Sequence, residues 1–322
     1  MNATTSTWRP KDIPSQTGRR VLITGANSGI GYHAALELAR HGATLLFASR
    51  DRARGEAALA RLRREATGPG SAASEAELVL LDLASLASVR EVAARIVADG
   101  RPLDLLVNNA GVMAPPKRLE TQDGFELQFG TNVLGHFALT LLLLPALRLA
   151  VGGVAPRVVT IASIAHLRGK IDFDDLQSLR RYAPMGSYAQ TKLADLMFAF
   201  ELERRLRAAG LGICSLAAHP GVANTNLFQV GDFSAPERAI RRLFGHAIGA
   251  LLNSDAEGAL PTLYAATAPE AECGGYYGPQ GFREMRGGDV GSAKISAAAR
   301  DMAAAKRLWQ VCEELTGVQF PV

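Results

Sequence analysis

Two kinds of hydrophobic pattern alternate along most of the chain. Six short segments are apolar almost throughout, as are strands buried on both faces of a sheet: 19–25, 43–50, 76–83, 103–111, 157–163 and 212–221. Apolar residues recur at helical spacing in the segments between them: 28–42, 52–66, 85–100, 123–150 and 187–209. Strands that alternate with helices predict an α/β fold built on a doubly wound parallel sheet.

The pattern indicates a single domain. Residues 1–18 contain several chain breakers and predict an irregular N-terminal arm, whereas no repeat or linker divides 19–322. From about residue 222 the periodicity weakens. We expect 222–322 to form a substrate lid and C-terminal extension, a small substrate-binding lobe that ends in a helix over 297–317. The apolar residues within 228–252 fit either a mobile lid over an apolar pocket or a packed pair of helices.

Composition and charge exclude few classes of function. The 322 residues are 48% hydrophobic and 20% charged, which is ordinary for a globular protein. The net charge of +4 comes from 35 Lys and Arg against 31 Asp and Glu, an excess too small to indicate a nucleic-acid partner. Six arginines between Arg50 and Arg64 make one basic patch, which we interpret as the charged face of a helix.

The cysteines and the apolar stretches indicate the expected cellular location of the protein. Cys214, Cys273 and Cys312 are far apart and odd in number, so the sequence predicts no disulfide framework and a reducing, cytoplasmic location. No signal peptide is visible, and the six histidines lack the spacing of metal ligands. The apolar stretch 137–151 is too short to span a bilayer and predicts a buried helix, with no integral membrane segment; peripheral membrane attachment stays open.

A glycine-rich turn, "TGANSGIG", connects the first predicted strand to the first predicted helix. Glycines at such a junction let the backbone approach a pyrophosphate, which the free N–H groups of the helix N-terminus bind. A tight turn without a ligand is the alternative. The sequence therefore predicts a dinucleotide site in a Rossmann fold, with these residues at the cofactor: Gly25, Asn27, Ser28, Gly29, Ile30 and Gly31.

The end of the second predicted strand indicates which dinucleotide binds. NAD sites usually carry an acidic residue there, whereas this strand ends in Ser49 and Arg50, which suit the 2′-phosphate of NADP. Asp51 follows directly and keeps NAD as the less favoured alternative. Asp82 and Leu83 end the third strand and are expected beside the adenine; a helix N-cap is the second interpretation of Asp82.

Tyr188 and Lys192 are four residues apart in the segment "GSYAQTK". On a helix this spacing puts both side chains on one face, where an ammonium stabilises a nearby phenolate and makes the phenol a useful acid or base. The same spacing fits an incidental pair on a surface helix. Motifs elsewhere in the chain have to separate the two interpretations.

Those motifs resemble the short-chain dehydrogenases/reductases, and they occur in the order of that family: "TGANSGIG" (24–31), "NNAG" (108–111), "TNVLGHF" (131–137), "IAS" (161–163), "YAQTK" (188–192) and "HPG" (219–221). The similarity extends from about residue 19 to residue 228. A long insert after Ser163 and the motif "GGYYGP" (274–279) are similar to the retinol dehydrogenase and protochlorophyllide reductase-like branch of the family.

The resemblance implies an enzyme with four catalytic residues. Tyr188 would be the general acid/base, and Lys192 would support it and bind the nicotinamide ribose. Ser163 would donate a hydrogen bond to the substrate oxygen; a cap at the strand end is the other interpretation. Asn132 would hold a water beside Lys192, and a kink in its helix is compatible with that role. We do not favour a role for His136, one turn further on.

The resemblance also implies further contacts to NADP(H). These are Asn108, Asn109, Ala110 and Gly111 on the adenosine side, and Pro220, Gly221, Val222 and Thr225 near the nicotinamide and pyrophosphate. The implied activity is the interconversion of a carbonyl and an alcohol on a lipophilic small molecule, without a metal. Reduction of a C=C bond, as protochlorophyllide reductase performs, and a non-catalytic NADP-binding sensor are the alternatives. A homodimer or homotetramer through the helices over 123–150 and 187–209 is implied too, unless the insert and the tail obstruct it.

Overall fold

The computed structural model describes residues 8–67, 75–148, 150, 153–222 and 253–321. Within them one sheet has the strand order β3-β2-β1-β4-β5-β6-β7-β8, parallel except for the antiparallel pair β7 and β8. The strands are β1 (Arg20–Thr24), β2 (Thr44–Ser49), β3 (Glu77–Leu80), β4 (Leu105–Asn108), β5 (Arg157–Ile161), β6 (Cys214–Ala218), β7 (Tyr276–Pro279) and β8 (Val290–Ser292). The six apolar runs are thus confirmed as neighbouring parallel strands.

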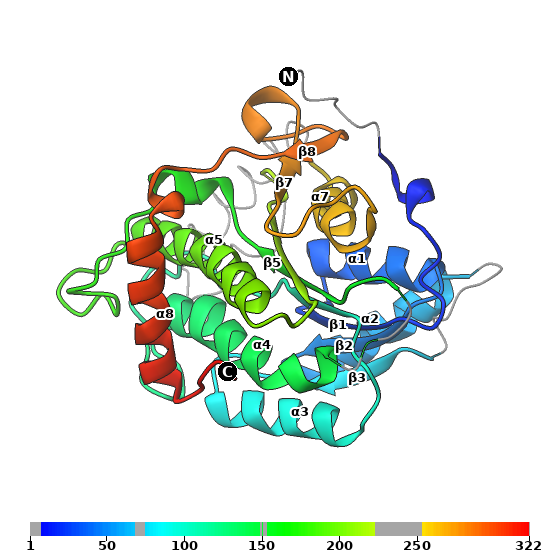
Figure 1. Ribbon diagram of the computed structural model, residues 1–322, viewed down its shortest axis with the longest axis horizontal. Helices are drawn as coiled ribbons and strands as arrows, with labels where there is room; N and C mark the ends of the chain where they lie inside the picture. Colours follow the sequence, from blue (N-terminus) through cyan, green and yellow to red (C-terminus); the bar gives the residue numbers. More distant parts are fainter. Residues whose placement is uncertain (1–7, 68–74, 149, 151–152, 223–252, 322) are drawn as a thin grey trace, which may run out of the picture.

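Helices cover both faces of this sheet (Figure 1). The helices α3, α4, α5 and α8 share one hydrophobic core with one face, and α1, α2 and α7 share a second core with the other. Their bounds are α1 (Gly29–Arg40), α2 (Arg52–Glu65), α3 (Leu86–Ala98), α4 (Gly135–Leu147), α5 (Pro184–Ala208), α7 (Asp255–Thr267) and α8 (Met302–Thr316). Alternate strand residues feed opposite cores: Leu22 enters the first, and Val21 and Ile23 the second.

The apolar helix expected over 123–150 is shorter in the structure and has a more complex start. It begins with a π-helical turn, η3 (Phe129–Leu134), and continues as α4 to Leu147, with Pro145 inside the last turn. By length and composition alone this segment could cross a membrane, with a mean hydropathy of 1.5, but 89% of it is buried inside the molecule. The prediction of a buried helix is confirmed, because the apolar residues face α3, α5 and the sheet.

The C-terminal part adds elements that the periodicity missed. Helix α7 begins at a capping box, in which Ser254 accepts the Glu257 N–H and Glu257 accepts the Ser254 N–H, and strands β7 and β8 extend the sheet. The helix expected over 297–317 is split into a short turn, η7 (Ala298–Arg300), and α8. Trp309 of α8 stacks on Phe198 of α5. The proposed mobile lid, residues 228–252, lies outside the described residues, as does Thr225.

The prediction of no disulfide is wrong, because the structure pairs Cys214 with Cys273. The two residues are 59 positions apart in the chain, but Cys214 begins β6 and Cys273 lies just before its parallel neighbour β7. The next residue, Gly274, donates its N–H to the Ser215 carbonyl at 2.8 Å, which brings the two segments together. Cys312 is a free, buried thiol.

Candidate active site

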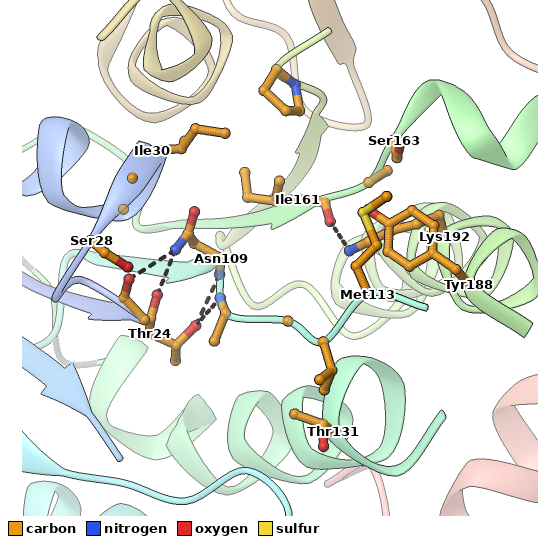
Figure 2. Close-up of a pocket in the computed structure, with 18 of the residues that line it drawn as sticks. Thr24, Ser28, Ile30, Asn109, Met113, Thr131, Ile161, Ser163, Tyr188 and Lys192 are labelled. Carbon is orange, nitrogen blue, oxygen red and sulfur yellow. Dashed lines mark hydrogen bonds between the residues drawn. The ribbon is translucent and has the colours of Figure 1, made fainter. Parts of the chain in front are cut away.

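A large cleft, about 1430 Å³ in volume, opens at the carboxyl ends of the parallel strands. It lies beside β1 and β4, where the strand order reverses and α/β sheets commonly bind ligands. Figure 2 shows Thr24, Ser28 and Asn109 on one side, and Ser163, Tyr188 and Lys192 on the other. Apart from Asn108 and Asn132, every predicted site residue that the structure describes lines this cleft.

The glycine-rich turn is held against β4 by Asn109. The Asn109 side-chain amide donates to the carbonyl of Thr24 at 2.8 Å and to that of Gly25 at 3.4 Å. A Cβ on Gly31 would lie 2.4 Å from the Asn109 Nδ2 and 2.6 Å from the Gly25 oxygen, so only glycine fits there. The turn therefore brings its backbone close to the N-terminus of α1, whose free N–H groups face the cleft and suit a pyrophosphate.

Asn108 is not a cleft residue, and its expected place beside the adenosine is wrong. Its side chain is buried and its amide donates to the Thr140 hydroxyl of α4 at 2.9 Å. Asn108 is the last residue of β4, and its side chain points into the core, whereas the next residue, Asn109, lines the cleft.

Two arginines near the junction of β2 and α2 lack acidic partners among the described residues: Arg50 directly follows β2, and Arg54 lies in the first turn of α2. Arg50 and Arg54 line the cleft, and neither forms an ion pair with any described residue. Asp51 is the N-cap of α2, and its carboxylate accepts the Arg54 N–H at 2.9 Å. The Ser49 hydroxyl donates to the Asp51 carbonyl at 3.0 Å. The only carboxylate adjacent to Arg50 in the chain is thus engaged in capping a helix.

Asp82 and Leu83 also line the cleft, one strand further along the sheet. The Asp82 carboxylate accepts the Ala84 N–H at 3.0 Å and so stabilises the turn after β3. The interpretation of Asp82 as a helix N-cap is wrong, because Ser85 caps α3 by accepting the Ser88 N–H.

Ser163, Tyr188 and Lys192 meet at the opposite end of the cleft. The Ser163 oxygen accepts the Ala165 N–H at 3.1 Å and caps the short turn η4 (Ile164–Arg168), while its own hydroxyl hydrogen bonds none of the described residues. It can therefore cap η4 and still donate to a ligand. Tyr188 is 7% exposed, and the Lys192 Nζ lies 5.8 Å from the centre of its ring. Their helix, α5, brings both side chains into the cleft, as the spacing predicted.

Asn132 lies behind the cleft, within the π-helical turn η3. Its Oδ1 accepts the Val112 N–H at 2.8 Å, and its Nδ2 donates to the Val112 carbonyl and the Thr191 hydroxyl. The side chain thus ties the loop after β4 to α5. The widened helical turn accords with the expected kink, and the expected water beside Lys192 stays a prediction.

His136 has structural contacts that the sequence did not reveal. Burial lowers the pKa of His136 to about 4, so the ring is neutral. Its Nδ1–H donates to the Asn132 carbonyl at 2.9 Å, which leaves Nε2 to accept the Thr24 hydroxyl at 2.9 Å. The Thr24 oxygen in turn accepts the N–H groups of Asn109 and Ala110. His136 therefore connects the π-helical turn to the end of the cleft that holds the glycine-rich turn.

The loop after β6 lines the cleft with Pro220, Gly221 and Val222. Gly221 has a φ of +72°, and a Cβ on it would lie 2.5 Å from the Met285 carbonyl, so this tight crossing requires glycine. The Val222 N–H donates to that same carbonyl at 2.7 Å. His219 is fully buried beneath the loop, accepts the Gly221 N–H and lies 3.4 Å from the Glu284 carboxylate.

Beyond Ser163 and Tyr188 the lining is mostly apolar. Side chains from four separate segments contribute to it: Met113, Ile164, Leu167, Met185 and Met285. Met113 lies beside Tyr188 and Lys192 in Figure 2. The sequence pattern did not identify these residues, because they lie on separate segments, in loops, in the short turn η4 and at the start of α5, whose relative positions depend on the tertiary structure.

Comparisons with known proteins agree on one family. The family model described as short chain dehydrogenase matches residues 19–232. The polyprenol dehydrogenase of Mus musculus is 43% identical over 311 residues, covering 96% of this chain and 87% of the relative; retinol dehydrogenase 13 of Homo sapiens is 40% identical over 306 residues, covering 94% and 86%. A crystal structure of an uncharacterised protein from Mycobacterium paratuberculosis has a TM-score of 0.76 at 40% identity, covering 98% of this chain and all of that one.

Proposed function

The chain belongs to the short-chain dehydrogenase family, in its retinol dehydrogenase-like branch, and we propose that it interconverts a carbonyl and an alcohol with NADP(H). The observation that carries the proposal is the convergence of Ser163, Tyr188 and Lys192 on one end of the cleft whose other end holds the glycine-rich turn. Oxidoreduction of a small molecule follows from the family. The cofactor preference, the residue roles and the substrate class are the proposed parts.

The residues present fit a dinucleotide. Gly31 leaves a space that a Cβ would fill, and the N-terminus of α1 offers free N–H groups beside that space. Arg50 and Arg54 offer positive charge at the adenosine end, where Asp51 is occupied by its helix cap. This arrangement supports NADP rather than NAD, because a 2′-phosphate needs cations and a free ribose hydroxyl needs an acceptor.

The catalytic end supplies a proton and holds the reacting oxygen. When bound, the nicotinamide provides or accepts a hydride. In reduction, the Tyr188 hydroxyl gives its proton to the substrate oxygen, while the Ser163 hydroxyl donates a hydrogen bond that stabilises the developing charge. The Lys192 ammonium favours the phenolate left on Tyr188. In oxidation the same groups act in reverse, with Tyr188 taking the proton from the alcohol.

The apolar lining beyond Tyr188 supports a lipophilic substrate. Methionines on three separate segments, Met113, Met185 and Met285, are flexible side chains that adapt to varied apolar ligands. Two relatives carry the names polyprenol dehydrogenase and retinol dehydrogenase, both of which denote lipophilic alcohols. A cytoplasmic location and a homodimer or homotetramer stay predictions. Light scattering coupled to size-exclusion chromatography measures the assembly directly.

The reaction class is tested by following NADPH consumption against aldehydes, ketones, quinones and retinal, with NADH in parallel. We expect turnover with an apolar carbonyl compound and an alcohol as the product. Tight NADPH binding without turnover of any compound would favour the sensor. A saturated product that keeps its carbonyl group would establish C=C reduction instead.

Arg50→Ala is expected to weaken NADPH binding by about ten- to a hundredfold and NADH binding much less. The substitution removes the guanidinium and, with it, a charge-assisted hydrogen bond that only the 2′-phosphate of NADPH can accept. Dissociation constants for both cofactors, measured by fluorescence, give the ratio. Arg52→Ala is the matched control, since Arg52 lies two residues further along the chain, pairs with Glu56 and does not line the cleft. Equal losses for NADPH and NADH in Arg50→Ala would exclude a 2′-phosphate contact.

A further inference from the structure

Lys192 has a buried acidic partner that none of the family motifs contains. The Asp195 carboxylate accepts a hydrogen bond from the Lys192 Nζ at 2.9 Å, and the Ile161 carbonyl of β5 accepts a second at 2.8 Å. The side chains are only 7% and 4% exposed. An ammonium has three hydrogens, so these two bonds leave one to point toward the cleft.

Among the residues that the structure describes, no second cation acts on Asp195. On its own helix it faces Lys192, with Tyr188 one turn further toward the N-terminus. From α8 it faces the Cys312 thiol, whose pKa is raised by burial and by Asp195, so the thiol is neutral. From α4, His136 faces Lys192 and is neutral as well. Lys192 is thus the one charged partner that the described residues give Asp195.

We propose that Asp195 is a positioning residue that keeps Lys192 charged and directs its remaining hydrogen toward the cofactor ribose and Tyr188. The inference rests on the proposed function of this site and extends it to a residue outside the catalytic four. Asp195 itself does not line the cleft, so it acts through Lys192.

The energetics of burial explain why Lys192 needs this partner. Burial alone would lower the pKa of Lys192, but the charge of Asp195, the nearby Tyr188 and the hydrogen bond that Lys192 donates to Asp195 together raise it above its ordinary value. Burial without a counterion lowers the pKa of a lysine by up to about three to five units, enough to bring the deprotonation of Lys192 into the neutral range. Burial also raises the pKa of Asp195, so the Asp195 carboxylate in turn needs the positive charge of Lys192 to stay ionised.

Removal of Asp195 has two opposing effects on Tyr188. An unpaired Lys192 that stayed charged would act on the phenol more strongly, and the phenolate would form at lower pH. A neutral Lys192 would stabilise the phenolate far less, and the phenolate would form at higher pH. The desolvation of a fully buried amine is large enough for the second effect to win.

The test measures the pH at which the rate of alcohol oxidation rises, the reaction in which Tyr188 would take the proton from the alcohol. In Asp195→Asn we expect this rise to move to higher pH by about one to three units, with weaker NADPH binding. Asp195→Glu keeps the charge and should restore most of the wild-type profile. Glu201→Gln is the matched control: Glu201 is a buried acid on the same helix that pairs with Arg204 and Arg205, away from the cleft. It should lower stability without moving the profile.

A profile that stays in place or moves to lower pH in Asp195→Asn overturns the proposal. Should that variant fail to fold, Asp195→Ser also removes the charge, leaves room for water and carries the same expectation. The phenolate absorbance of Tyr188, obtained by subtracting the titration of Tyr188→Phe, follows the same ionisation without a substrate. It therefore tests the role of Asp195 even if the proposed reaction is not found.

Discussion

Replacement of Tyr188 by phenylalanine is expected to lower carbonyl reduction by about a hundred- to ten-thousandfold, the usual contribution of a positioned proton donor. Phenylalanine fills the same largely buried position on α5, where Tyr188 is 7% exposed, and lacks only the hydroxyl. That hydroxyl bonds none of the described residues, so its loss should cost little stability and leave NADPH binding nearly intact. Steady-state rates and the dissociation constant of NADPH measure the two effects separately.

Tyr182→Phe is the matched control for that experiment. The Tyr182 hydroxyl donates to the Pro115 carbonyl at 2.8 Å, and Tyr182 does not line the cleft. Its removal should cost about 1 kcal/mol of folding free energy and leave turnover unchanged. A Tyr188→Phe enzyme that kept close to the wild-type rate would show that another group, or a water, donates the proton.

Gly31→Ala is expected to lose cofactor binding by tenfold or more, together with about 1–3 kcal/mol of stability. The added methyl carbon would lie 2.6 Å from the Gly25 carbonyl, a backbone atom that cannot rotate away, and 2.4 Å from the Asn109 amide. Relieving the clash has to move the turn or break the hydrogen bonds of Asn109 to it. Thermal unfolding with and without NADPH measures both losses, because the ligand stabilises only a chain that binds it.

Gly288→Ala provides the comparison. A Cβ there would meet only the Arg9 guanidinium at 3.8 Å, an ordinary contact, and Gly288 does not line the cleft. We expect its unfolding temperature and its response to NADPH to match the wild type. If Gly31→Ala showed the same unchanged response, the close packing of the glycine-rich turn would not be needed for the cofactor.

Local patterns predicted much of the fold. Each apolar run found in the sequence is a strand, and the helices between them begin and end within a few residues of the expected positions, except over 123–150. The pattern failed where a strand lacks an apolar run. Strands β7 and β8 have the sequences YYGP and VGS, and pairing with β6 and with each other holds them in the sheet.

The site was predicted in the same uneven way. Motif positions located Tyr188, Lys192 and the glycine-rich turn, because their chemistry depends on neighbours within a few residues. The choice between Asn108 and Asn109 depended on which face of β4 meets the cleft, and the role of Asp51 depended on where α2 begins. Both are questions of geometry that one strand or one helix cannot answer alone.

The sequence determined the alternation of strands and helices, the glycine-rich junction and the tyrosine–lysine pair, since each is set by residues close together in the chain. Only the tertiary structure decided the contacts between distant segments. His136 bonds Thr24 across 112 positions, and Cys214 pairs with Cys273 across 59. Asp195 is only three residues from Lys192, yet β5 and α8 have to bury the pair before its charge can matter. Burial is a property of the whole fold, and it decides what a charged pair does.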